Sequence, residues 1–225
     1  MKESNRKRKF NKTYYIFVEG ETERWYFEHL ERLINSYEFK NQNVKFVIKR
    51  IRWPESAAKS VVSIYPVDCF QVFDFEGTSD EDETNFERIL SEYRDIRKYH
   101  SNVNYSLGYS NLTFELWMIL HRKNIEGHVA NKHSYLKYIN KAFSKSFISL
   151  NDFKDEKNFK AILSEYIHLE DIKIAIRNAE KIRERKVLSK AKANEMCKFK
   201  YYIDNPDCTI HECVKTIFND CGIEI

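Results

Sequence analysis

Three acidic residues of this chain stand directly behind two apolar runs. Glu19 follows the run at residues 14–18, and Asp74 and Glu76 follow the run at residues 69–73. In an open parallel sheet, ligands gather outside the carboxyl ends of the strands, so these side chains are expected in one crevice. Asp74 and Glu76 are two positions apart, and in an extended segment their side chains leave the same face. Carboxylate oxygens are the ligands that Mg²⁺ prefers, so the pattern predicts a magnesium site formed by Glu19, Asp74 and Glu76.

A fourth acidic residue, Glu115, lies in the first turn of a helix predicted to begin near Thr113, again just beyond a predicted strand. Glu115 either caps that helix in solvent or points into the same crevice. His121, farther along the helix, is read either as a site residue or as a core histidine. Acidic residues at the start of a helix also interact favourably with the helix dipole, whether or not they form a functional site. This is the alternative explanation for Glu19 and its neighbours Glu21 and Glu23. The acidic residues 80–83 are expected to form a solvated loop.

The first half of the chain alternates between strand and helix signals, which predicts βαβ units and a mainly parallel sheet flanked by helices. Strands are expected at residues 14–18, 46–48, 69–73 and 104–109, and helices at about 22–36, 57–64, 85–99 and 113–122.

The second half changes character. After about Gly127 no convincing strand signal is seen, and helices are expected near 133–144, 156–166 and 169–193. A last helix is expected to begin at Thr209, with Glu212 completing a capping box. The predicted organisation is a basic N-terminal arm at 1–12, an α/β core at 13–127 and a helical extension at 128–225.

Basic residues gather near both ends of the chain, although the net charge of the 225 residues is only +4. A basic helix could hold RNA phosphates, or it could be an ordinary solvated helix. The candidate nucleic-acid-binding residues are Arg177, Lys181, Arg183, Arg185, Lys186, Lys190 and Lys192.

Composition excludes two broad classes of protein. Hydrophobic residues make up 42% of the chain, which is enough for a folded core and excludes wholesale disorder. No apolar run approaches the roughly 20 residues that a membrane span needs, and the basic start does not read as a signal peptide. A cytoplasmic protein without a membrane partner is expected.

Several short motifs resemble the RloB family. They are residues 18–23 with Tyr26 and Phe27, residues 72–76, and Phe114-Glu115-Leu116-Trp117 with His121. The resemblance spans about residues 13–218. It implies a Toprim-like α/β core in which Glu19 is the catalytic glutamate and Asp74 the first acid of the metal motif. Glu76 departs from the family pattern, where an aspartate is usual.

The resemblance also implies bacterial antiphage defence and cleavage of nucleic acid. The combined hypothesis is a Mg²⁺-dependent nuclease, with Mn²⁺ as an alternative ion, that hydrolyses RNA and in particular tRNA. Two alternatives stay open: a phosphodiesterase acting on a nucleotide second messenger, and a non-catalytic nucleic-acid-binding partner of a defence ATPase. Assembly into a homo-oligomer stays open as well.

Overall fold

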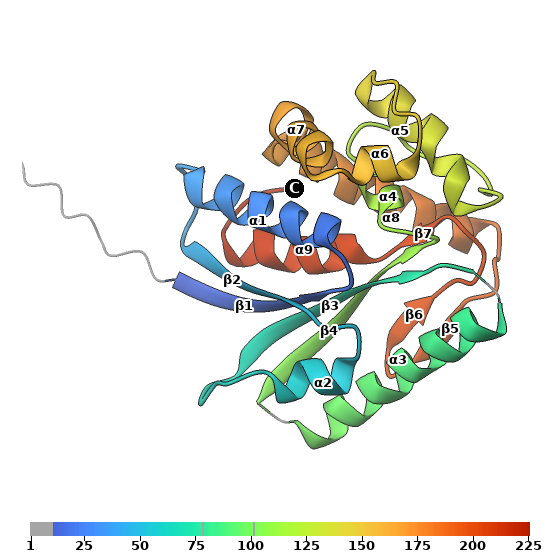
Figure 1. Cartoon of the computed structure of the whole chain (residues 1–225). Coiled ribbons are helices and arrows are strands. Elements are labelled where there is room, and N and C mark those ends of the chain that lie inside the picture. The colour runs from blue at the N-terminus through green and yellow to red at the C-terminus, as the bar shows by residue number, and fades with distance from the viewer. Residues whose placement is uncertain (1–10, 78, 101) are drawn as a thin grey trace, which may run out of the picture.

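The computed structural model describes residues 11–77, 79–100 and 102–225, so most of the predicted N-terminal arm, residues 1–10, lies outside the described part. Five strands form the main sheet (Figure 1), and two more form a separate hairpin. The main-sheet strands are β1 (Asn11–Val18), β2 (Asn43–Arg50), β3 (Val67–Phe75), β4 (Val103–Asn111) and β7 (Asp207–Cys208), and the hairpin strands are β5 (Asn194–Met196) and β6 (Phe199–Tyr201).

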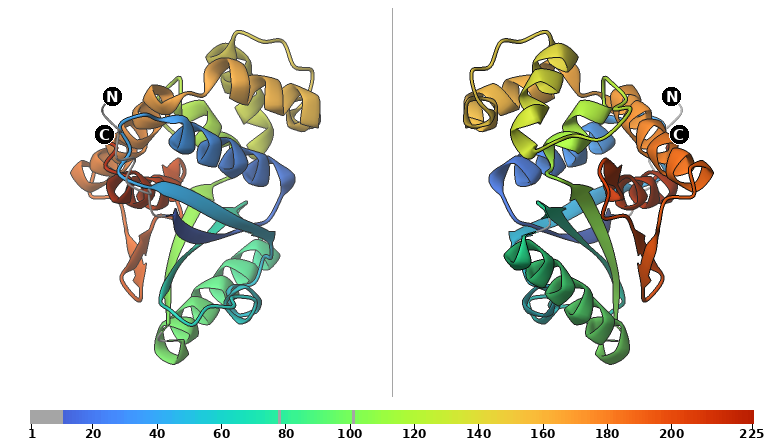
Figure 2. Two further views of the ribbon diagram at one scale, coloured as in Figure 1. Left: turned by 90° about the vertical axis from the view of Figure 1, so that its left-hand side faces the viewer. Right: turned by 90° about the vertical axis from the view of Figure 1, so that its right-hand side faces the viewer.

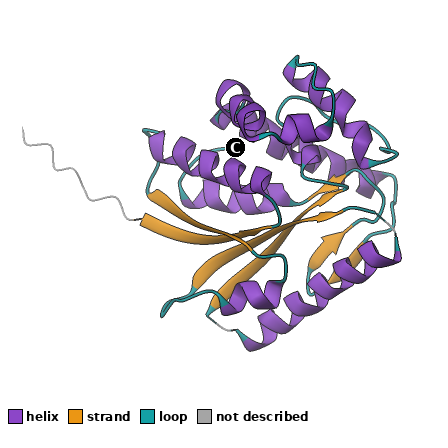
Figure 3. Cartoon of the chain, viewed as in Figure 1, coloured by secondary structure: helices purple, strands orange, loops and turns teal. Residues whose placement is uncertain are grey.

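The strand order in the main sheet is β2-β1-β3-β4-β7. Strands β1 to β4 run parallel, and the short β7 pairs antiparallel with the end of β4. Helices lie against the sheet on two sides (Figure 3). The predicted fold class, an α/β protein with a mainly parallel sheet flanked by helices, is confirmed.

The central strands are buried on both faces, as parallel sheets usually are. In β1, Ile16 and Val18 join the larger apolar cluster, whereas Phe17 between them joins a second cluster on the other face. The apolar run seen in the sequence therefore reflects two-sided burial.

Two layers of helices cover the sheet (Figure 2). Helices α1, α4, α8 and α9 contribute to the larger cluster with α5–α7 packed beyond them, and α2, α3 and the β5–β6 hairpin form the other layer. The bounds are α1 (Glu21–Ser36), α2 (Pro54–Lys59), α3 (Asp80–Tyr99), α4 (Glu115–Leu120), α5 (Tyr135–Phe143), α6 (Leu150–Lys154), α7 (Glu156–Tyr166), α8 (Leu169–Leu188) and α9 (Ile210–Asp220), with a 3₁₀ turn at Lys132–Ser134.

Some predicted elements were wrong in detail. The helix expected at 57–64 ends at Lys59, and the acidic residues 80–83 form the first turn of α3 because Ser79 caps it. The strands β5, β6 and β7 were missed because they have two or three residues each, too few for a periodic pattern. The capping box at Thr209 does not form, since the Thr209 hydroxyl accepts a hydrogen bond from the Tyr109 backbone instead.

The predicted boundary near residue 127 stays a prediction. The segment after it contributes β7 to the main sheet and α8 and α9 to the larger apolar cluster. None of the helices in the described ranges is both long enough and apolar enough to cross a membrane.

Candidate functional site

The sheet brings Glu19 and Asp74 together at its carboxyl edge. Glu19 is the first residue after β1, and Asp74 is the penultimate residue of the neighbouring strand β3. The two strands are paired in parallel with Phe17 opposite Gln71, so β3 continues past the end of β1 and Asp74 lies only one position beyond the level of Glu19. The backbone of Asp74 lies close enough to the Glu19 carboxyl group to lower its pKa, which places the two acids side by side.

The start of α1 adds a third acid, Glu23. Its side chain folds back toward Gly20, the residue before the helix, and is buried. Its Oε2 accepts a hydrogen bond of 2.9 Å from the Thr22 hydroxyl. A Cβ atom at position 20 would lie only 2.7 Å from the same oxygen. The absence of a side chain at Gly20 therefore makes room for the Glu23 carboxyl group.

Helix α4 supplies the fourth acid. Glu115 is its first residue and is only 1% exposed. The Oε1 atom of Glu115 lies 2.8 Å from Nζ of Lys154, the last residue of α6. The Oε2 atom has no hydrogen-bond partner. The reading of Glu115 as a crevice residue is therefore the one that its position supports.

Two carboxylate oxygens of this cluster are shielded from solvent and have no partner: Asp74 Oδ1 and Glu115 Oε2. Glu19 Oε1 is shielded as well and forms no hydrogen bond, but it pairs with Arg52. Each comes from a different element. A buried acceptor that is left unpaired is costly and calls for an explanation, of which an ion is one.

Burial and neighbouring like charges raise the pKa values of three acids in this cluster. Burial raises the pKa of Glu19 to about 7, although Arg52 opposes this shift. Burial, and then Glu23, Glu19 and Glu115, hold the pKa of Asp74 well above its usual range. Burial and Glu115 also raise the pKa of Glu23. Like charges and desolvation both disfavour the ionised forms, so the site favours protons or another cation.

Two basic side chains border the acids. Nε of Arg52 lies 3.2 Å from Oε1 of Glu19, and Lys154 contacts Glu115. Sequence reasoning missed Arg52, Lys154 and Glu23. The sequence predicts Glu23 only as an acid that favours the helix dipole, and its spacing of four residues from Glu19 is the one signal for a role in the site. Nothing in the sequence links Lys154 to Glu115 or to the other acids of the cluster, which all lie far away in the chain.

Two of the predicted site residues, Glu76 and His121, are not part of the cluster of buried acids. Glu76 is exposed, and its Oε2 pairs with Lys132 Nζ at 2.5 Å. It still contributes to the raised pKa of Glu19, which places it at the rim of the cluster. His121 is fully buried, with its two ring nitrogens bonded to the Tyr26 hydroxyl and the Trp117 carbonyl. Burial lowers the pKa of His121 to about 3, as expected of a neutral core histidine.

The donor set fits a hard divalent cation. In the part of the chain that the structure describes, no group of three or more His, Cys, Asp or Glu side chains is already arranged to hold a metal ion. Mg²⁺, however, usually keeps several waters and uses only one or two carboxylates directly. The unpartnered oxygens of Asp74 and Glu115 meet that requirement.

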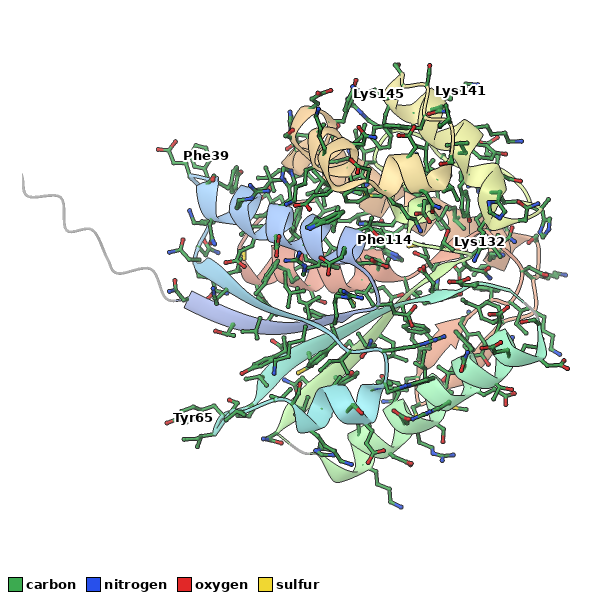
Figure 4. The ribbon with its side chains drawn as sticks, viewed as in Figure 1. Phe39, Tyr65, Phe114, Lys132, Lys141 and Lys145 are labelled. Carbon is green, nitrogen blue, oxygen red and sulfur yellow. The ribbon has the colours of Figure 1, made fainter. Side chains whose placement is uncertain are left out.

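A pocket of about 550 Å³ opens beside the rim residue Glu76. Lys132, His128 and His133 line it together with Asp82. Its neighbour, of about 530 Å³, shares His128 and is lined by the predicted residues Arg185 and Lys186. Figure 4 labels Lys132, which projects near β7 at the carboxyl end of the sheet.

The other predicted nucleic-acid-binding residues do not line these two pockets. Arg183 lies instead beside a third pocket, where its guanidinium group is 3.6 Å from Glu212. Arg177, Lys181, Lys190 and Lys192 all lie outside the linings of the first two pockets.

The fold is an α/β protein with a parallel sheet that gathers a cluster of buried carboxyl groups at its carboxyl edge. The chain belongs to the RloB-like family, because the family model described as RloB-like protein matches residues 14–217. This membership supports a defence-associated role. No curated protein and no solved structure matched the chain.

Proposed function

We propose that this protein is a Mg²⁺-dependent phosphodiesterase of the RloB-like family that cuts RNA, in particular tRNA, in antiphage defence. The observation on which the proposal rests is the pair of shielded, unpartnered carboxylate oxygens on Asp74 and Glu115, beside the buried carboxyl group of Glu19. A purely structural role would leave these two buried oxygens paired or hydrogen-bonded.

The residues divide the work as follows. Asp74 and Glu115 offer oxygens to the ion, and Lys154 and Arg52 hold Glu115 and Glu19 in place. A bound Mg²⁺ would polarise a phosphodiester and lower the pKa of a coordinated water. Glu19, whose pKa is about 7, is suited to accept a proton near neutral pH. The pocket beside Glu76 opens at the same edge of the sheet, next to Asp74 in the chain, and is where we expect part of the RNA to bind.

The first test is cleavage of cellular RNA by the purified protein with Mg²⁺ or Mn²⁺, followed by mapping of the fragment ends. We expect Glu19→Gln and Asp74→Asn each to reduce cleavage by a factor on the order of 10²–10⁴ while the protein stays folded. Glu81→Gln, at an exposed position in the first turn of α3, is the matched control and should leave cleavage unchanged.

Small nucleotides are tested in parallel, because a pocket of about 550 Å³ is also large enough for a mononucleotide-sized ligand. Degradation of nucleotides without cleavage of RNA would favour the second-messenger phosphodiesterase. RNA binding without cleavage, unaffected by Glu19→Gln, would favour the non-catalytic partner of a defence ATPase. Full activity of both acid variants would contradict the proposal.

A further inference from the structure

Lys154 reaches the acidic cluster from a short helix whose position is fixed by packing. Helix α6 begins after Ser149, whose hydroxyl accepts a hydrogen bond of 3.0 Å from the Asp152 backbone. Phe153, next to Lys154, is fully buried, and its ring lies 5.6 Å from that of Phe147 and 5.3 Å from that of Phe159. The ammonium group is therefore delivered to Glu115 by a rigid element.

The contact between Lys154 and Glu115 differs from the other lysine ion pairs of this helical layer. In the pairs Lys145–Glu165 and Lys160–Glu156, the acid side chains are 52% and 62% exposed. Glu115 is 1% exposed, and its second oxygen is unpartnered. The Lys154 side chain is itself 39% exposed, so the difference lies in the acid. Exposed pairs contribute little, whereas a pair with one buried partner is screened less by solvent and salt.

The net charge of the fully ionised cluster matches the charge of one divalent ion. Four carboxyl groups (Glu19, Glu23, Asp74 and Glu115) face two basic side chains, Arg52 and Lys154. When all are ionised, two negative charges remain, and a single Mg²⁺ neutralises them. A second ion would have to enter beside the Lys154 ammonium group, which repels it.

We propose that Lys154 is a positioning residue that takes the place of a second divalent cation, so that the site binds a single ion. This inference rests on the proposed function, since it assumes that the cluster binds a metal. Lys154 holds one oxygen of Glu115 and leaves the other free for the ion. Its charge also weakens the binding of that ion, so removal of the charge should strengthen binding.

The test is calorimetric titration of the full-length protein with Mg²⁺, repeated with Mn²⁺, at pH 8. The wild-type protein should bind one ion per chain. Lys154→Met should bind the first ion at least about tenfold more tightly, because the repulsion between two nearby cations is removed. Lys154→Arg keeps the charge and should stay within about threefold of the wild type. Lys160→Met, in the same helical layer, is the matched control and should leave binding unchanged.

A merely structural role for Lys154 predicts the opposite sign, because loss of the support for Glu115 would weaken ion binding. We also expect Lys154→Met to cut RNA more slowly although it binds the ion more tightly. Two ions bound per wild-type chain, or weaker binding by Lys154→Met, would overturn the inference. The stoichiometry of the wild type is informative even if Lys154→Met fails to fold.

The two proposals fail in different ways. If Glu19→Gln abolishes cleavage while Lys154→Met binds Mg²⁺ as the wild type does, the inference about Lys154 falls and the nuclease stands. If neither protein binds Mg²⁺ or Mn²⁺, the inference falls and the metal is removed from the proposed function as well.

Discussion

Gly20 is placed so that its missing side chain decides where the Glu23 carboxyl group can lie. Its backbone angles, φ −127° and ψ 178°, are extended and open to any residue. A Cβ would nevertheless lie 2.7 Å from Glu23 Oε2, so Gly20→Ala should push this carboxyl group out of the cluster. We expect RNA cleavage to fall by about tenfold, with the free energy of unfolding changed by no more than about 1 kcal/mol, since the backbone tolerates alanine.

A double-mutant cycle tests whether this effect passes through Glu23. Cleavage by Gly20→Ala, Glu23→Gln and the double variant is compared with that of the wild type, with chemical denaturation as the measure of stability. If the alanine acts by displacing Glu23, it should change little once Glu23 has lost its charge. Independent, additive losses would contradict the mechanism.

At the scale of single residues, the sequence predicts the acids that directly follow strands and little else of the site. Glu19 and Asp74 could be found because a strand end has a recognisable sequence signature. Glu23 could not be found, because its burial depends on the space left by the missing side chain of Gly20, which is seen only in the folded structure. Lys154 is brought in by tertiary packing alone, and Glu76 lies at the rim because the chain leaves the sheet after Phe75.

At the scale of elements, α6 is the piece on which the geometry of the site depends most. Phe153 anchors this five-residue helix in the core. We expect Phe153→Ala to destabilise the protein by about 3–5 kcal/mol, the usual cost of deleting a buried phenyl ring. At temperatures where the variant is still folded, cleavage should also fall, because Lys154 loses its fixed position beside Glu115.

Urea denaturation checks the stability part of this prediction, and Phe39→Ala provides the matched control. Phe39 is 74% exposed and projects at the periphery (Figure 4), so its truncation should change stability by less than about 0.5 kcal/mol. Equal losses in the two variants would show that α6 is not anchored as described.

The elements that could be predicted are those long enough to show a period. The helix at 156–166 can be predicted because its apolar residues recur at helical spacing, and the central parallel strands because they form continuous apolar runs. Helix α6 and strand β7 have five and two residues, too few for a period. Strand β7 exists because it pairs with the end of β4, a contact between residues about 100 positions apart.

At the scale of the whole molecule, buried titratable groups of two kinds set the dependence of stability on pH. Burial lowers the pKa of His29, of His121 to about 3 and of His211 to about 4. A histidine that stays neutral when folded but is protonated when unfolded makes the protein more stable as the pH rises toward 6.5. The acidic cluster acts in the opposite direction, so only a comparison of variants separates the two effects.

Glu19→Gln isolates the contribution of the cluster. The pKa of Glu19 rises from 4.5 to about 7 on folding, so between these values the folded chain holds a proton that the unfolded chain has released. Stability of the metal-free wild type is therefore lost as the pH rises through this window, whereas the glutamine variant, which cannot ionise, keeps it. The histidine contributions cancel in the difference between the two proteins.

We expect Glu19→Gln to be close to the wild type in stability at pH 4.5 and more stable by about 2–3 kcal/mol at pH 8 in EDTA, measured by urea denaturation. Mg²⁺ at millimolar concentration should stabilise the wild type more than the variant and narrow this gap, because an ion that binds only the folded state shifts the equilibrium toward it. A difference in stability that does not depend on pH would show that Glu19 is not buried against its acidic neighbours. A difference that Mg²⁺ leaves unchanged would show that Glu19 is not part of a cation site.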